Sequence, residues 1–268
     1  MLEAGVHQGV GLQGLAFQTA PHLVVLASHE DRATELPLLW DLCQSWTELG
    51  YPVVVLDATQ SESAERPGLQ QLLDPHCRPH ERPQPALDTA WAIHPARLGL
   101  GQLCQRTAAP LTALAQLFAQ HDVVLLYMPA DQLAEQLEGQ GIEPLLAVSA
   151  QERSVLTAYQ AVKMLLVKGK LQPTLVTLVD SADADSLAHS AKLQHSLQGC
   201  AMSFLGRRVT ALQVDTHAAS DASRRDMDRL ALRLLEASTM ARYDSGMLDT
   251  PKIEPDAPDV PERGKRSH

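Results

Sequence analysis

Two short runs of apolar residues, separated by a helical pattern, most constrain how this chain can fold. The first run extends from Leu23 to Ser28 and the second from Val53 to Asp57. Neither run alternates apolar and polar residues, which is typical of parallel strands covered by helices on both faces. Between them, Leu36 to Leu49 carries apolar residues at helical spacing. We therefore predict a strand, a helix and a second, parallel strand at the start of one domain.

The same alternation continues along the chain and sets the fold class. Strands that regularly alternate with helices form a mostly parallel sheet with right-handed crossovers. We predict a single α/β domain with a doubly wound sheet of about seven strands flanked by helices. The further strands are expected at 89–94, 123–128, 145–148, 173–179 and 209–214, with helices at 68–73, 130–138, 152–167, 185–202 and 224–243 and one more that ends at Gln120.

The ends of the chain differ from this central part. Residues 1–21 are rich in Gly and Gln, but they carry Val10, Leu12, Leu15 and Phe17. This pattern leaves two interpretations open, a short partner-binding segment or a frayed terminus. Residues 22–243 form the predicted domain. Residues 244–268 combine prolines and mixed charge with few apolar side chains, so we expect a disordered tail.

Composition excludes several classes of protein. The formal net charge is -10, and a constitutive nucleic-acid binder needs a basic face. The cysteines are widely separated and lie mostly among apolar residues, so we expect buried, reduced thiols at Cys43, Cys77, Cys104 and Cys200. No apolar run is long enough to cross a membrane, and the first residues do not resemble a secretory signal. We expect a cytoplasmic protein.

Two further stretches suggest a ligand or a membrane at first sight. His76, Cys77 and His80 lie close together, but a closed zinc site needs four ligands, and His94 and Cys104 are only remote additions. We expect a surface loop and no metal there.

The helix expected over Arg224 to Tyr243 has arginines on one side and apolar residues on the other. It could lie on an anionic membrane, but packing on its own domain is favoured.

The loop after the first strand normally opens the ligand crevice of such a fold. A phosphate site there needs glycines, so that successive N–H groups converge on the anion, and a lysine that offsets its charge. The stretch from His29 to Pro37 contains neither glycine nor lysine. Thr34 supplies a hydroxyl and Arg32 a cation, while Glu30, Asp31 and Glu35 would repel an anion.

A simpler interpretation of this stretch is structural. Asp31, Thr34 or Glu35 would cap the helix that we expect to start near Leu36. Tyr127, at the end of the strand 123–128, favours the same view. An acid in that place often serves a metal or a water, whereas a tyrosine can fill apolar space with its hydroxyl at the rim.

Several segments together resemble the MinD/ParA class of P-loop ATPases, and within it the FlhG (FleN) family, which regulates flagellar number and placement. His7 to Ala16 is similar to that family's N-terminal segment at Gln8 and Leu12. The stretch from Leu145 to Lys163 and the triplet Phe204-Leu205-Gly206 also fit family patterns.

The departures from the family concentrate at its nucleotide site. His29 to Pro37 stands in place of the glycine- and lysine-rich loop, and Thr59 replaces the second acid after Asp57. Tyr127 replaces an aspartate that supports magnesium, and Asp180 replaces the asparagine that contacts adenine. The degenerate nucleotide-site positions implied by the resemblance are therefore Glu30, Arg32, Thr34, Asp57, Tyr127 and Asp180.

These departures imply a non-catalytic, MinD-like scaffold, a pseudo-ATPase without nucleotide or metal, that regulates flagellar assembly through protein contacts. The resemblance implies that Gln8, Leu12 and Leu15 contact the FlhF GTPase or another flagellar regulator, and that the chain is a monomer or an ATP-independent dimer. Three alternatives remain: an ATPase that uses ATP and magnesium with Arg32 in place of the lysine, a MinD-like regulator of cellulose export or pilus positioning, and an enzyme with an unrelated ligand.

Overall fold

The computed structural model describes residues 20–78, 83, 90–179, 184–215 and 221–246. Its strands are β1 (His22–Ser28), β2 (Val53–Asp57), β3 (Ala92–Pro95), β4 (Val123–Pro129), β5 (Leu145–Val148), β6 (Thr174–Val179) and β7 (Thr210–Asp215). Its helices are α1 (Arg32–Glu48), α2 (Leu69–Leu73), α3 (Arg97–Arg106), α4 (Pro110–Leu117), α5 (Ala130–Gln136), α6 (Glu152–Lys163), α7 (Ala184–Leu205) and α8 (Asp221–Gly246), and a π-helical turn, η3 (Met164–Lys168), follows α6.

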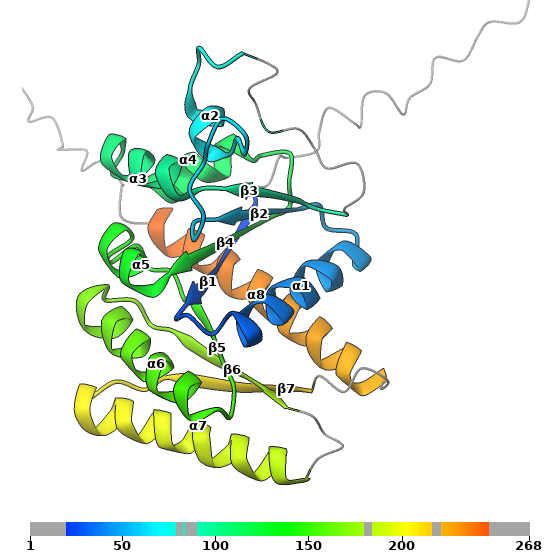
Figure 1. Cartoon of the computed structure of the whole chain (residues 1–268), viewed down its shortest axis with the longest axis vertical. Helices are drawn as coiled ribbons and strands as arrows, with labels where there is room; N and C mark the ends of the chain where they lie inside the picture. Colours follow the sequence, from blue (N-terminus) through cyan, green and yellow to red (C-terminus); the bar gives the residue numbers. More distant parts are fainter. Residues whose placement is uncertain (1–19, 79–82, 84–89, 180–183, 216–220, 247–268) are drawn as a thin grey trace, which may run out of the picture.

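The seven strands form one sheet in the order β3-β2-β4-β1-β5-β6-β7, and every pair of neighbours is parallel (Figure 1). Along the chain, the strands after β1 are added on one side of it, and those after β4 on its other side. The direction of winding therefore reverses around β1 and β4. This arrangement confirms the predicted doubly wound α/β sheet.

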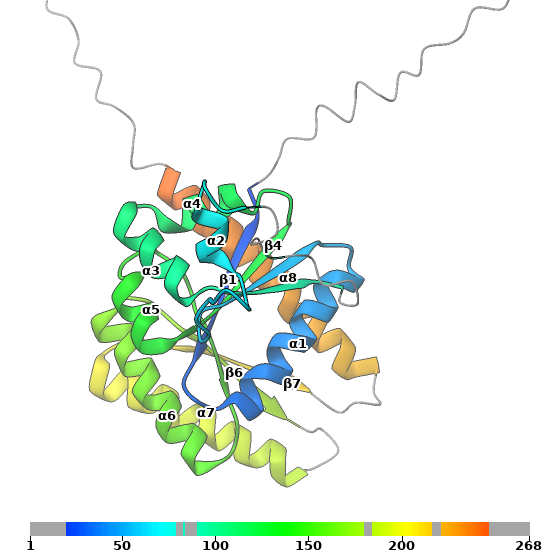
Figure 2. The same ribbon diagram turned by 45° about the horizontal axis from the view of Figure 1, so that its top comes forward.

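Helices cover the two faces of the sheet unequally. On one face, α1 and α8 pack side by side on a core that contains Leu42, Trp46 and Leu230 (Figure 2). The indole Nε1 of Trp46 donates a hydrogen bond to the carbonyl oxygen of Ala231 at 3.0 Å, which fixes α1 against α8. The helices from α2 to α7 cover the opposite face, where the core cluster includes Leu100 of α3. Each helix thus contributes one apolar side to a core, as expected for amphipathic helices.

Several boundaries differ from the sequence prediction. Helix α1 begins at Arg32, one turn before the predicted Leu36, and it includes Pro37. The single helix expected to end at Gln120 is two helices, because Pro110 stands at the first position of α4, where its missing N–H group is tolerated. The helix expected over 152–167 passes into the π-helical turn η3 after Lys163.

The C-terminal helix α8 packs on its own domain, as the sequence analysis favoured. Its apolar side is buried through Met227, Leu230 and Leu235. On its exposed side, Arg224 forms an ion pair with Glu48 of α1 at 3.2 Å. Among the helices of the described residues, none has both the length and the apolar composition to cross a membrane.

Most of the predicted chain ends, 1–19 and 247–268, lies outside the described residues, but helix α8 continues to Gly246 and so includes the first three residues of the expected tail. The four cysteines are free thiols, as expected, but only Cys43 is fully buried, and the other three are half-buried. Burial raises the pKa of the Cys43 thiol to about 12.

Candidate functional site

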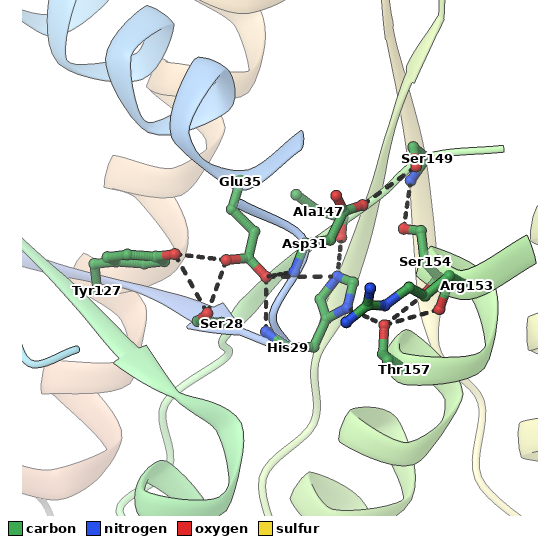
Figure 3. Close-up of polar contacts among 10 residues, drawn as sticks. All are labelled: Ser28, His29, Asp31, Glu35, Tyr127, Ala147, Ser149, Arg153, Ser154 and Thr157. Atoms are coloured by element: carbon green, nitrogen blue, oxygen red, sulfur yellow. Dashed lines mark hydrogen bonds and ion pairs between the residues drawn. The ribbon is translucent and has the colours of Figure 1, made fainter. Parts of the chain in front are cut away.

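The turn between β1 and α1 is short and closed around a carboxylate. Only His29, Glu30 and Asp31 connect Ser28 to the first helical residue. Glu30 adopts a left-handed backbone conformation (φ 74°). The Glu35 side chain, from the first turns of α1, points back into this turn and is fully buried (Figure 3).

Four donors converge on the Glu35 carboxylate. Its Oε1 accepts hydrogen bonds from the backbone N–H groups of His29 (2.7 Å) and Asp31 (3.2 Å). Its Oε2 accepts from the hydroxyls of Ser28 (2.8 Å) and Tyr127 (2.5 Å). A carboxylate has about four lone-pair positions, so this buried group is fully satisfied. It links β1, α1 and β4.

Tyr127 fills the place next to Glu35 at the carboxyl end of β4. Its side chain is buried, and its hydroxyl lies within reach of both Glu35 and Ser28. Burial, and then the hydrogen bond to Glu35, raises the pKa of the Tyr127 phenol well above its ordinary value. The neutral phenol therefore acts as a donor to the carboxylate at physiological pH.

His29 closes the other side of the turn, toward β5. Strands β1 and β5 pair through Leu26 and Leu145 only, so they separate beyond that point. The His29 ring fills the gap: its Nε2 lies 2.6 Å from the carbonyl oxygen of Ala147, and its Nδ1 lies 2.8 Å from the hydroxyl of Thr157 on α6. Because a carbonyl only accepts, Nε2 carries a hydrogen.

Asp31 adds a second link to β5. Its Oδ2 accepts a hydrogen bond from the Ser149 hydroxyl at 3.2 Å. Burial acts to raise the pKa of the Asp31 carboxyl, but hydrogen bonds with Ser154, Thr34 and Ser149 and the nearby His29 ring together lower it below the ordinary value. Asp31 is therefore ionised at neutral pH.

These contacts lie at the position where ligands usually bind in open α/β sheets. That position is the crevice at the carboxyl ends of the strands, where the direction of winding reverses. Here Glu35 and Tyr127 connect β1 to β4, while His29 and Asp31 connect β1 to β5 or to the loop that follows it (Figure 3). The side chains at this position therefore form hydrogen bonds to one another and to the backbone of β5.

The structure brings together only part of the predicted site. The expected loop from His29 to Pro37 is mostly helix, because α1 begins at Arg32. Thr34 is buried in the first turn of α1, whereas Glu30 and Arg32 are exposed. Asp57 lies beside Tyr127 in the sheet, but its Oδ1 accepts from the backbone N–H (2.9 Å) and hydroxyl (2.6 Å) of Thr59. The remaining predicted positions, Asp180, Gln8, Leu12 and Leu15, lie outside the described residues.

The helix cap does not take the form that the sequence predicted, because the first N–H groups of α1 receive no capping bond from the side chain of Asp31. Asp31 occupies the N-cap position but its side chain makes no capping hydrogen bond, and Glu35 instead accepts from the N–H group of Asp31. Sequence reasoning missed the roles of Ser28 and His29. Their only signal was an unbroken series of polar residues directly after an apolar strand.

A second buried carboxylate, Glu62, organises the neighbouring edge of the sheet. Its Oε2 accepts from the N–H group of Leu98 at 2.8 Å, and its Oε1 from that of Gly99 at 2.8 Å and that of Gln70 at 3.2 Å. It thereby caps α3 and joins α3 to α2. Gly99 is required for this close approach, because a Cβ there would lie 2.5 Å from the backbone nitrogen of Gln70.

No metal-binding group of three or more His, Cys, Asp or Glu residues occurs in the described part of the chain. His76 is exposed and Cys77 is half-buried in the loop after α2, while His80 lies outside the described residues.

Comparisons with known proteins give structural but not sequence relatives. No protein-family model and no curated protein matches the sequence. The structure is similar to cobyrinic acid a,c-diamide synthase from Mycobacterium smegmatis with bound ADP and magnesium, with a TM-score of 0.54 and 13% identity over 86% of this chain and 100% of that chain.

Two further similar structures have lower scores. The MinC:MinD cell division protein complex of Aquifex aeolicus has a TM-score of 0.49 and 12% identity over 86% of this chain and 98% of that chain. A ParA family ATPase from Chlorobium tepidum TLS has a TM-score of 0.44 and 11% identity over 84% and 97%. At such identities a likeness shows the fold alone. The chain therefore shares the α/β fold of the synthase, with a seven-stranded parallel sheet flanked by helices.

Proposed function

We propose that this chain is a non-catalytic, MinD-like cytoplasmic protein that regulates flagellar assembly through protein contacts and binds no nucleotide. The observation that carries the proposal is the Glu35 carboxylate in the β1–α1 turn. It uses the N–H groups of His29 and Asp31, which a phosphate at this turn would need.

The turn is also too short and too acidic for a phosphate. A loop of the G-x-x-x-x-G-K-[ST] type places about six residues before its lysine, whereas three residues connect Ser28 to α1 here. A phosphate about 4 Å from an ionised carboxylate is repelled by about 4 kcal/mol at an effective dielectric of about 20. Binding would therefore require expulsion of Glu35 from a buried position in which four donors satisfy it.

The flagellar part of the proposal rests on the resemblance of the N-terminal segment. Gln8 and Leu12 match the family segment through which, by resemblance, the FlhF GTPase or another flagellar regulator would be contacted, and Leu15 adds an apolar side chain to it. A scaffold that binds no nucleotide has no need for an ATP-driven dimer. We therefore infer a monomer, or a dimer whose formation does not depend on ATP.

Calorimetric titration of the full chain with ATP and magnesium tests the absence of nucleotide binding. We expect no heat of binding and an unchanged oligomeric state by light scattering. The cobyrinic acid a,c-diamide synthase of Mycobacterium smegmatis, whose structure contains ADP and magnesium, is the positive control. Sub-micromolar binding, or a dimer that requires ATP, would refute the proposal.

The partner is tested separately. We expect the full chain to capture FlhF from solution, and we expect the variant with Gln8→Ala, Leu12→Ala and Leu15→Ala to lose this capture. A matched control changes Gln13 and Gln18 to Ala. If FlhF is not captured by the wild-type chain, the flagellar part is wrong, while the titration above still decides whether nucleotide binds.

A further inference from the structure

The outer side of α1 carries an apolar patch that no described residue covers. Leu36 and Trp40 on α1 are 45% and 50% exposed, and Pro37 between them is also exposed. Ile93 on β3 is 48% exposed. We call these four residues the Trp40 patch.

At the Trp40 patch, Trp91 lies between Trp40 of α1 and the start of β3. The rings of Trp40 and Trp91 meet edge to face, with centroids 4.8 Å apart. Trp91 lies directly before β3 and belongs to the same core cluster as Val55, the pairing partner of Ile93, so Trp91 and Ile93 lie on the same face of the sheet. Ile93 pairs with Val55, whose side chain belongs to the core under α1. Helix α1 and the edge of the sheet therefore form one continuous surface.

Such a surface is unusual on a chain with few aromatic residues. Only 4% of the residues are aromatic, and two of the three tryptophans are in this contact. Contiguous exposed apolar residues usually mark a place where another segment binds. In addition, β3 is the edge strand of the sheet in the described part of the chain, and an edge strand is where an added segment can pair.

The chain that precedes β1 is long enough to reach this surface. Extended by one residue beyond Ala92, the registers of β3, β2, β4 and β1 place Trp91 in the same transverse row as His22. The order β3-β2-β4-β1 places the two residues three strand spacings, or about 14 Å, apart. Five residues of extended chain, from Phe17 to His22, span about 17 Å.

We propose that residues 10–17 of the same chain dock on the Trp40 patch. This stretch supplies the apolar side chains of Val10, Leu12, Leu15 and Phe17, and it carries no charged residue. Their burial against Trp40 and Ile93 removes apolar surface from water on both sides. While the segment is docked, it cannot bind an external partner. The Trp40 patch and such a partner therefore compete for the N-terminal segment.

Tryptophan fluorescence of the full chain without any partner tests the docking. The variant combining Leu12→Ser, Leu15→Ser and Phe17→Ser should expose Trp40, so its emission should shift to longer wavelength and acrylamide should quench it more strongly than in the wild type. The control variant changes Gln13 and Gln18 to Ser and should behave as the wild type. Trp40→Phe, measured in parallel, assigns the signal to Trp40.

The reciprocal measurement starts from the patch. In the wild type, amides of residues 10–17 should be protected from hydrogen exchange, and Ile93→Ser should reduce that protection. Unchanged fluorescence in the triple variant, or unprotected amides in the wild type, would overturn the proposal. A signal that disappears on dilution would also overturn it, because the patch would then bind a second copy. These readouts involve neither FlhF nor ATP, so they succeed or fail independently of the proposed function.

Discussion

Glu35 is buried where α1 meets the sheet, and four donors depend on its carboxylate. In Glu35→Ala, the N–H groups of His29 and Asp31 and the hydroxyls of Ser28 and Tyr127 lose this acceptor. We expect the free energy of unfolding to fall by at least about 3 kcal/mol, because each buried donor left without an acceptor costs about 1–3 kcal/mol. Glu35→Gln keeps the size and one acceptor oxygen, so the loss should be only about 1–3 kcal/mol.

Urea denaturation at neutral pH measures both changes. Glu48→Ala is the control on the same helix, because Glu48 is 44% exposed and pairs with Arg224 at the surface. Its effect should stay below about 1 kcal/mol. Equal losses for Glu48→Ala and Glu35→Ala would contradict the role assigned to Glu35.

Tyr127 should make the protein sensitive to alkali. Because its folded pKa lies above the ordinary value of 10.0, the unfolded chain releases this proton first. The stabilising effect is thus present below about pH 10 and is lost as the pH rises toward the folded pKa. In a spectrophotometric titration, one of the four tyrosines should ionise only when the protein unfolds. Tyr127→Phe should remove that step, and a wild type whose tyrosines all ionise in the folded state would disprove it.

The residues of the closed turn were only partly predictable from the sequence. Glu35 and Tyr127 stood out because an acid after a strand and a tyrosine at a strand end are local signals. Their hydrogen bond joins positions 92 residues apart, and that of His29 to Ala147 joins positions 118 residues apart. Such pairs depend on which strands become neighbours, and the order of the strands cannot be derived from apolar runs alone.

Pro37 weakens helix α1 from within. It lies beyond the first turn, so the carbonyl group of Ala33 lacks its usual N–H partner. Because Pro37 is exposed, Pro37→Ala should stabilise the protein by about 1–2 kcal/mol, after subtracting the greater freedom of the unfolded chain. Thermal unfolding measures the gain. Pro110→Ala is the matched control: Pro110 begins α4, so no gain is expected there.

Glu62 fixes the positions of α2 and α3. The N-cap residue Ala96 has no side-chain acceptor, and the Glu62 carboxylate takes over this role for Leu98 and Gly99. Glu62→Ala should destabilise the protein by about 1–3 kcal/mol and should speed hydrogen exchange at these two amides. The exposed neighbour Glu65, changed to Ala, should have no measurable effect. Unchanged exchange at Leu98 and Gly99 in Glu62→Ala would rule out the capping role.

Whole elements were predicted more reliably than their ends. The strand runs at 53–57, 123–128 and 145–148 needed no tertiary information, because short apolar runs without alternation, rich in Val and Leu, are typical of strands in a covered sheet. The ends of α1 and α3 did need it. The buried bonds of Glu35 extend α1 by one turn at its start, and Pro110 interrupts a pattern whose apolar spacing continues across it.

At the scale of the whole molecule, two partly buried histidines should make stability depend on pH near neutrality. Burial, and then the neighbouring His121, lowers the pKa of His94 below its ordinary value of 6.5. Burial also lowers the pKa of His121, although the carbonyl group of Phe118 and the charge of Asp122 partly oppose this. Protonation of either histidine is therefore easier in the unfolded chain than in the folded one.

Below about pH 6.5 the unfolded chain therefore binds more protons than the folded chain, and the free energy of unfolding decreases as the pH falls. The contribution of the two neutral histidines to the free energy of unfolding is complete above that pH. It is lost as the pH falls through their folded pKa values. Urea unfolding at intervals from about pH 7.5 to about pH 5, above the ordinary range of carboxyl groups, isolates it. The double variant His94→Gln, His121→Gln should show a flatter dependence than the wild type. His195→Gln, which alters an exposed histidine of α7, should keep the wild-type slope, and a double variant as steep as the wild type would refute the assignment.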